Sequence, residues 1–144
     1  MNRSPRLLDC TLRDGGYLND WNFGSNTLTC IFDRLNEAGI DIIEVGFLDD
    51  KYDYDMNRTI QPDTQSLGRV FSKTVAKKSM VVAMVDIGNC RIDNIQPRKD
   101  TILDGIRLIF KKERMDEAIS FAKELVSLDY AVFLQLVSIT DYGK

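Results

Sequence analysis

The chain has 144 residues, 44% of them hydrophobic and 28% charged, with a formal net charge of -3. These proportions are typical of an ordinary globular domain, and they give no reason to expect a nucleic acid or an anionic membrane as a partner. The sequence shows no apolar run typical of a signal peptide or a membrane span, and three scattered cysteines indicate reduced thiols in a cytoplasmic protein. The absence of histidine excludes a histidine-based metal site or a histidine base within these residues.

The first half of the chain alternates short β-branched runs with helical patterns. A strand is predicted over Leu7–Leu12, followed by a helix from about Thr27 to Ala38 with Ser25 as its N-cap. A strand over Ile42–Phe47 and a helix from about Thr64 to Ala76 come next. Each helix directly follows a strand, which is the order expected of a parallel sheet.

The second half continues the same alternation. It predicts a strand over Met80–Ile87, a helix between Cys90 and Leu103, and a strand over Ile106–Phe110. A helix over Met115–Ser127 and a strand over Ala131–Val137 end the pattern. Four residues of this last helix recur at helical spacing and are predicted to face inward: Ala118, Ile119, Ala122 and Leu125.

The repeated order of strand, helix and strand predicts right-handed βαβ units and a parallel sheet. Two architectures fit: the first five β/α units of a (β/α)8 TIM barrel, which in full needs about 250 residues, or a complete five-stranded doubly wound sheet. The barrel is preferred because one face of the predicted sheet carries polar and charged side chains, which suit a barrel interior better than a face covered by helices. These side chains are Asp9, Thr11, Glu44, Arg107 and Gln135. Strict alternation places Phe47 on the opposite, apolar face.

The stretch Arg13-Asp14-Gly15-Gly16 follows the first predicted strand. An Asp-Gly pair is typical of a hairpin turn. A hairpin needs a second alternating strand, however, and the residues that follow are polar and aromatic and lead into a helix. The stretch is therefore interpreted as a loop between a strand and a helix, at the end of the sheet where barrels place their chemistry.

Residues Asp9–Gly16 read DCTLRDGG and resemble the D-x-T-L-R-D-G signature of the metal-dependent aldolase and acyltransferase superfamily. Two further segments are similar to elements of that family: Leu35–Phe47 to the end of its first helix and its second strand, and Ile106–Leu125 to its fourth strand and helix. Members include hydroxymethylglutaryl-CoA lyase, isopropylmalate synthase and hydroxy-oxovalerate aldolase. The sequence resembles hydroxy-oxovalerate aldolase most. The resemblance implies a (β/α)8 barrel that binds a divalent cation, Mg2+ or Mn2+, and acts on a 2-oxo acid or an acyl-CoA type of substrate.

The resemblance also implies roles for individual residues. Asp14 matches a carboxylate ligand of the metal, and Arg13 matches the residue that faces the oxygen of an enolate, where a guanidinium stabilises the developing charge. Glu44 matches an inward glutamate that supports the arginine or the metal shell. Tyr17 stands where the family often has glutamine or histidine, and it is expected to donate a hydrogen bond or relay a proton. Gln135, on the predicted polar face, is expected to contact the substrate.

One departure bears on the whole interpretation, because the family's His-x-His metal pair lies on a later strand and this chain has no histidine. Residues 1–144 are therefore interpreted as a single domain, the N-terminal segment of a longer barrel, inactive alone and prone to self-association through open strand edges. The leading hypothesis is a divalent-metal-dependent carbon–carbon lyase, an aldolase. The alternatives are a Claisen-type acyltransferase of the same superfamily and a non-catalytic binding module.

Overall fold

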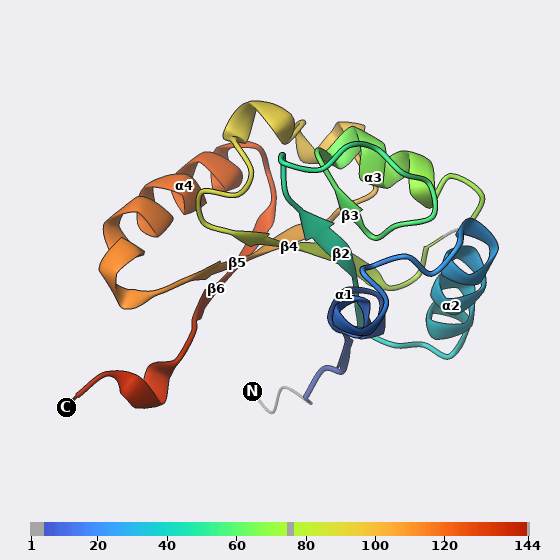
Figure 1. Ribbon diagram of the computed structural model, residues 1–144, viewed down its shortest axis with the longest axis horizontal. Helices are drawn as coiled ribbons and strands as arrows, with labels where there is room; N and C mark the ends of the chain where they lie inside the picture. Colours follow the sequence, from blue (N-terminus) through green and yellow to red (C-terminus); the bar gives the residue numbers. More distant parts are fainter. Residues whose placement is uncertain (1–4, 75–76, 144) are drawn as a thin grey trace.

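A curled parallel sheet with helices on one side forms the framework of the computed structural model, which describes residues 5–74 and 77–143 (Figure 1). The strands are β1 (Leu8–Asp9), β2 (Ile42–Leu48), β3 (Ile60–Gln61), β4 (Met80–Asp86), β5 (Gly105–Phe110) and β6 (Ala131–Leu136). The α-helices are α1 (Thr11–Asp14), α2 (Ser25–Glu37), α3 (Thr64–Val70) and α4 (Met115–Ser127). Short 3-10 turns cover Gly15–Leu18, Ile92–Asn94, Arg98–Asp100, Lys112–Arg114 and Ile139–Asp141.

The strands lie in the order β1-β2-β4-β5-β6, and every pair in the sheet is parallel. β1 pairs with the first two residues of β2 and the short β3 with the last two, so both lie along the same edge of β2. Residues of α2, α3 and α4 share one core with one face of the sheet, which leaves the concave face free of the longer helices. The arrangement is a half-barrel. It differs from the doubly wound alternative, in which helices cover both faces.

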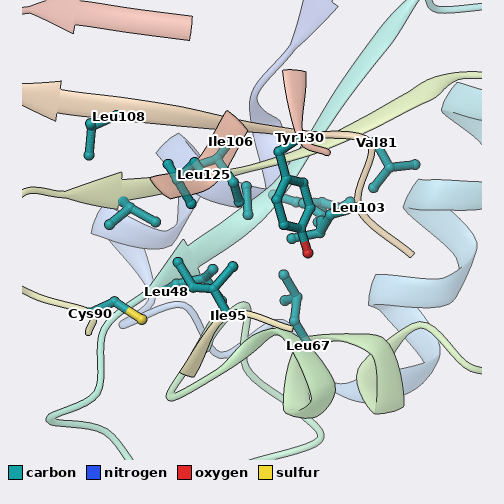
Figure 2. Packing of buried hydrophobic residues seen from close by; sticks show 14 of the residues in the cluster. Leu48, Leu67, Val81, Cys90, Ile95, Leu103, Ile106, Leu108, Leu125 and Tyr130 are labelled. Carbon is teal, nitrogen blue, oxygen red and sulfur yellow. The ribbon is translucent and has the colours of Figure 1, made fainter. Parts of the chain in front are cut away.

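The main core lies between the sheet and these helices, and Figure 2 shows part of it. Alternate strand residues such as Val81, Ile106 and Leu108 face Leu67 of α3 and Leu125 of α4, and all are fully or almost fully buried. This packing is what the alternating strands and amphipathic helices of the sequence predict. The core also contains the thiol of Cys90, which is buried, and burial raises the pKa of this thiol to about 12.

The first strand is much shorter than predicted. Only Leu8 and Asp9 pair with β2, and the chain then turns into the helical segment Thr11–Asp14. The carboxylate of Asp9 accepts hydrogen bonds from the Thr11 backbone N–H (2.9 Å) and hydroxyl (3.1 Å). Such local bonds compete with a strand ladder and favour a turn. As a result Arg13 and Asp14 stand on a helical turn rather than at the end of a strand.

The second strand contains a bulge that the alternation did not predict. Its register against β4 shifts between Glu44 and Phe47, so both side chains face the concave side, although they are three residues apart. Leu48 instead joins the main core. The expectation that Phe47 shares a face with Ile43 and Val45 is therefore wrong, because a bulge inserts one residue and reverses the alternation beyond it.

Two of the predicted helices also differ. Gly24, with a φ of 79°, stands at the N-cap of α2, and Ser25 is the first helical residue rather than the cap. α3 is capped by Asp63, whose side chain accepts a hydrogen bond from the Ser66 N–H at 2.6 Å. It ends at Val70, and the predicted end of this helix at Ala76 lies outside the described residues.

The predicted helix between Cys90 and Leu103 is wrong, because this segment forms only two 3-10 turns. Pro97 cannot donate a backbone hydrogen bond and disfavours helical geometry at the residue before it. The helix α4 agrees with its prediction in length. Ala118, Ala122 and Leu125 are buried, but Ile119 is 39% exposed rather than inward-facing.

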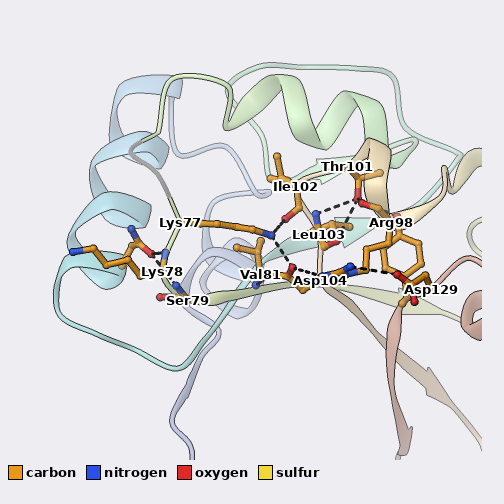
Figure 3. A network of polar contacts seen from close by, with 12 residues as sticks. Lys77, Lys78, Ser79, Val81, Arg98, Thr101, Ile102, Leu103, Asp104 and Asp129 are labelled. Carbon is orange, nitrogen blue, oxygen red and sulfur yellow. Dashed lines mark hydrogen bonds and ion pairs between the residues drawn. The ribbon is translucent and has the colours of Figure 1, made fainter.

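Charged residues form a network at the amino-terminal ends of β4, β5 and β6 (Figure 3). Asp104 accepts a hydrogen bond from the Val81 N–H at 2.9 Å and forms an ion pair with Lys77 at 2.8 Å. Arg98 lies 3.5 Å from the same carboxylate and 3.3 Å from Asp129. These contacts tie the loops that enter three strands to one another, so this end of the sheet has a structural role.

The edge strand β6 leads to a prediction about association. Among the described residues β6 pairs with β5 alone, and Leu134 of β6 is 53% exposed, next to Ile119 and Val126 of α4. Unpaired backbone groups beside apolar side chains favour pairing with another chain. We expect sedimentation velocity to show self-association that increases with protein concentration. Leu134→Lys should shift the protein toward monomer, whereas a wild-type monomer at every concentration would contradict the prediction.

Candidate functional site

A buried carboxylate organises the concave face of the half-barrel. Glu44 of β2 is fully buried, and its two oxygens accept hydrogen bonds from two arginines, from Arg13 Nε to Oε2 at 2.7 Å and from Arg107 Nη1 to Oε1 at 2.7 Å. A buried carboxylate requires such charged partners. Glu44 balances one of the two positive charges, and the exposed carboxylate of Asp14 pairs with the guanidinium of Arg13 from the other side. Glu44 was expected to support either the arginine or the metal shell, and the structure places it in contact with Arg13.

Arg13 reaches Glu44 from the helical turn α1. Its carbonyl accepts a hydrogen bond from Trp21 Nε1 at 2.8 Å, and its guanidinium carbon lies 5.7 Å from the ring centre of Phe47. Burial disfavours the charge of Arg13, but the hydrogen bond and negative charge of Glu44 outweigh this effect, so the pKa of Arg13 lies above its ordinary value. The side chain is therefore a permanently charged donor held in a defined place.

Arg107 and Gln135 complete the polar cluster from neighbouring strands. Arg107 Nη2 donates a hydrogen bond to Gln135 Oε1, and the register of β5 with β6 explains why the two meet. Ile109 lies opposite Gln135 in the sheet, and Arg107 is two residues before Ile109 on the same face. A guanidinium has five N–H donors. The hydrogen bonds that Arg13 and Arg107 make within the cluster leave further donors for a ligand on each.

Asp14, the predicted metal ligand, lies next to the cluster. Its Oδ1 is 2.5 Å from Arg13 Nη1, and its side chain is 58% exposed. No group of three or more aspartate, glutamate, cysteine or histidine side chains within residues 5–74 and 77–143 could hold a metal ion. The described residues thus offer one suitable oxygen ligand but not a complete site for Mg2+ or Mn2+, which prefer several oxygen ligands.

Tyr17, the predicted proton relay, lies on the aromatic side of the same face. Its side chain is 63% exposed, and its ring packs edge-on against Trp21 at 4.9 Å and Phe47 at 6.3 Å between ring centres. These rings line a small cavity of about 160 Å³ near the carboxyl ends of β2, β4 and β5. The cavity lies beside Arg13, because Phe47 contacts both.

The sequence analysis placed Glu44, Arg107 and Gln135 on one polar face, and the structure brings these three side chains together, but no role was predicted for Arg107. Its signal was an arginine between apolar residues in the strand Ile106–Phe110, which predicted a position on the polar face. Its bridging contact with Glu44 depends on the separation of β2 and β5 in the sheet, and a single sequence does not contain that information. The hydrogen bond that Trp21 Nε1 donates to the Arg13 carbonyl was not predicted either.

The comparisons with known proteins concern the fold. The chain is similar in structure to "the N-terminal domain of a putative aldolase from Bacteroides vulgatus", with a TM-score of 0.64 and 22% sequence identity. The fold is aldolase-like. The match covers 95% of this chain and 46% of the other, so this chain spans less than half of that length. No protein-family model matches the sequence, and no curated protein matches it.

The curled parallel half-barrel agrees with the coarser expectation, a partial barrel, and the full (β/α)8 barrel that the resemblance implied stays a proposal. At 22% identity the likeness supports the fold and leaves the chemistry to be argued from the site.

None of the helices in the described part of the chain is both long enough and apolar enough to cross a lipid bilayer.

Proposed function

We propose that this chain is the N-terminal segment of a (β/α)8 barrel enzyme, a carbon–carbon lyase of the aldolase type that acts on a 2-oxo acid. The observation that carries the proposal is the pair of guanidiniums, Arg13 and Arg107, bridged by the buried carboxylate of Glu44. The aldolase-like fold supports it, as does the position of this cluster on the concave face of the sheet. The activity requires a longer chain than the one described.

The chemistry follows from where charge develops. Cleavage of the C3–C4 bond of a 4-hydroxy-2-oxo acid leaves its electron pair on the oxygen of the 2-carbonyl, as an enolate. The 4-hydroxyl loses its proton and becomes the carbonyl of an aldehyde, and the enolate takes up a proton at C3. Arg13 has N–H donors fixed by Glu44, and such preorganised donors stabilise the enolate oxygen in the transition state. Arg107 and Gln135 lie beside it and hold the substrate carboxylate. We assign proton relay to the Tyr17 hydroxyl, which stands at the edge of the same face.

Asp14 is the residue of this chain to which we assign binding of a divalent cation. Its exposed carboxylate supplies one oxygen ligand for Mg2+ or Mn2+, and the other ligands come from outside the described residues. The residue already forms an ion pair with Arg13, so a bound cation competes with that contact. The steps of the proposed reaction are therefore assigned to the side chains of Arg13, Arg107, Gln135 and Tyr17.

Oxalate, which resembles the enolate of pyruvate in charge and shape, tests this site. We expect it to quench the fluorescence of Trp21, the only tryptophan, and to bind at least about tenfold more weakly to Arg13→Gln, because a charged hydrogen bond is lost. In the longer chain that supplies the remaining ligands, Mn2+ should tighten oxalate binding to wild type but not to Asp14→Asn. Fluorescence titration measures both effects.

The matched control is Arg34→Gln, which removes an arginine that is 78% exposed on α2 and should leave oxalate binding unchanged. Thermal unfolding of each variant separates a lost ligand contact from a lost fold. Equal oxalate affinity in wild type and a folded Arg13→Gln variant would contradict the proposed function.

A further inference from the structure

The small cavity beside Arg13 has a lining unlike that of the arginine cluster. Its walls combine the aromatic rings of Tyr17, Trp21, Phe47 and Tyr52 with the carboxylate of Asp86 at the end of β4. Asp49 and Asn89 also line it, and no arginine or lysine among the described residues does. The concave face therefore has a basic part and an adjoining aromatic and acidic part. A ligand that occupies both parts must therefore be anionic at one end and carry hydrogen-bond donors and carbon surface at the other.

The carboxylate of Asp86 is the acidic group of this cavity that lacks a hydrogen-bond donor among the described residues. Its side chain is partly buried, and within residues 5–74 and 77–143 no group donates a hydrogen bond to its carboxylate. Its backbone carbonyl, not its side chain, accepts the Asn89 N–H of the following turn. The pKa of Arg114 is raised mainly by its hydrogen bond with Glu117 and further by the negative charge of Asp86. Arg114 nevertheless donates its hydrogen bonds to Glu117 and to the Ile87 carbonyl. The carboxylate thus remains available as an acceptor at the cavity wall.

The sheet register sets the distance between the two parts. Asp86 lies opposite Ile109 of β5, and Arg107 is two residues earlier on the same face. Two residues of a strand rise by about 7 Å. An anionic group held by Arg13 and Arg107 is therefore separated from Asp86 by roughly the length of a short sugar-like chain.

We propose that this cavity binds the part of the substrate beyond the bond that breaks, and that it selects a chain carrying several hydroxyl groups. The inference rests on the proposed function, which places the 2-oxo acid group at the arginines. Asp86 accepts hydrogen bonds from the distal hydroxyls, and the aromatic rings pack against the carbon chain, as they do with amphipathic ligands. The substrate is then a polyhydroxylated 2-oxo acid whose aldehyde half resembles a small sugar.

The same lining disfavours an acyl-CoA substrate. Acyl-CoA carries several phosphate groups, and the described lining of the cavity offers them no lysine or arginine. The carboxylates of Asp49 and Asp86 repel phosphate groups. Among the functions that the sequence left open, the cavity therefore favours the aldolase over the acyltransferase.

Two probes that differ only in the distal hydroxyls test the inference: 4-hydroxy-2-oxohexanoate and 4,5,6-trihydroxy-2-oxohexanoate. Their binding to this chain can be followed by Trp21 fluorescence, since that ring lines the cavity. Wild type should bind the trihydroxy probe about tenfold to a hundredfold more tightly, as expected for hydrogen bonds to a charged acceptor. Asp86→Ala should reduce the preference to within about twofold. Asp86→Asn, which keeps the shape, should give an intermediate preference.

Asp100→Ala is the matched control, because Asp100 is exposed in a 3-10 turn away from the cavity, and it should keep the full preference. If wild type binds both probes equally and Arg13→Gln weakens both, the inference is overturned while the proposed function stands. A preference that persists in a folded Asp86→Asn variant at the wild-type level also overturns it. If neither probe binds, the proposed function and the inference fail together.

Discussion

Glu44→Gln is expected to lower the free energy of unfolding by about 3 kcal/mol, because removing one partner of a buried ion pair leaves the other charge uncompensated. Here two arginines lose the carboxylate that both contact at 2.7 Å, and both are mostly buried. Glutamine keeps the shape of glutamate but supplies one oxygen acceptor instead of two. Urea unfolding at pH 7, followed by circular dichroism, measures the change through the transition midpoint.

Glu37→Gln is the matched control. Glu37 also pairs with an arginine, at 3.1 Å, but both side chains are exposed on α2. Exposed pairs contribute little, so the change should stay within about 0.5 kcal/mol. If Glu44→Gln lowers the free energy of unfolding as little as Glu37→Gln does, the buried cluster does not stabilise the fold. In that case Glu44 would serve mainly to position the arginines for a ligand.

Gly46→Ala is expected to cost about 3 kcal/mol, since both its backbone angle and its surroundings exclude a side chain. Gly46 has a φ of 156°, and a Cβ there would lie 1.9 Å from the Thr59 carbonyl oxygen. That oxygen also accepts the hydrogen bond from the Phe47 N–H at 3.0 Å, which holds the bulge. Thermal and urea unfolding should both show the loss.

The neighbouring comparison is Gly68→Ala in α3, where a Cβ would meet no atom within 4 Å. Alanine is the better helix former by about 1 kcal/mol. We therefore expect Gly68→Ala to leave stability unchanged or to raise it. If Gly46→Ala were as mild as Gly68→Ala, the bulge in β2 would not be the feature that fixes Phe47 on the concave face.

How much of the fold the sequence could predict depends on the range of the interactions involved. The strands β4, β5 and β6 and the helices α2 and α4 were predicted within a few residues, because their hydrophobic patterns are local and strong. The first strand was overextended. The side chain of Asp9 bonds back to Thr11 and diverts the backbone, and a pattern of apolar residues does not record that competition.

The candidate site shows the same division. Arg13 and Asp14 were found through the DCTLRDGG stretch, and Glu44 through its place in an apolar strand. Arg107 was placed on the correct face, but its bond to Glu44 joins strands that are not neighbours in the sheet, with β4 between them. The cavity required the bulge as well, since Phe47 lines it only because the alternation of β2 reverses at Gly46.

The buried thiol of Cys90 can be used to measure how often the main core opens. The thiol is buried in the main core, and with a pKa of about 12 it presents almost no thiolate to an alkylating reagent at neutral pH. Modification of Cys90 therefore waits for the surrounding packing to open, and its rate measures how often that happens without denaturant. Exposed Cys30 reacts with the same reagent and provides an internal standard in every sample.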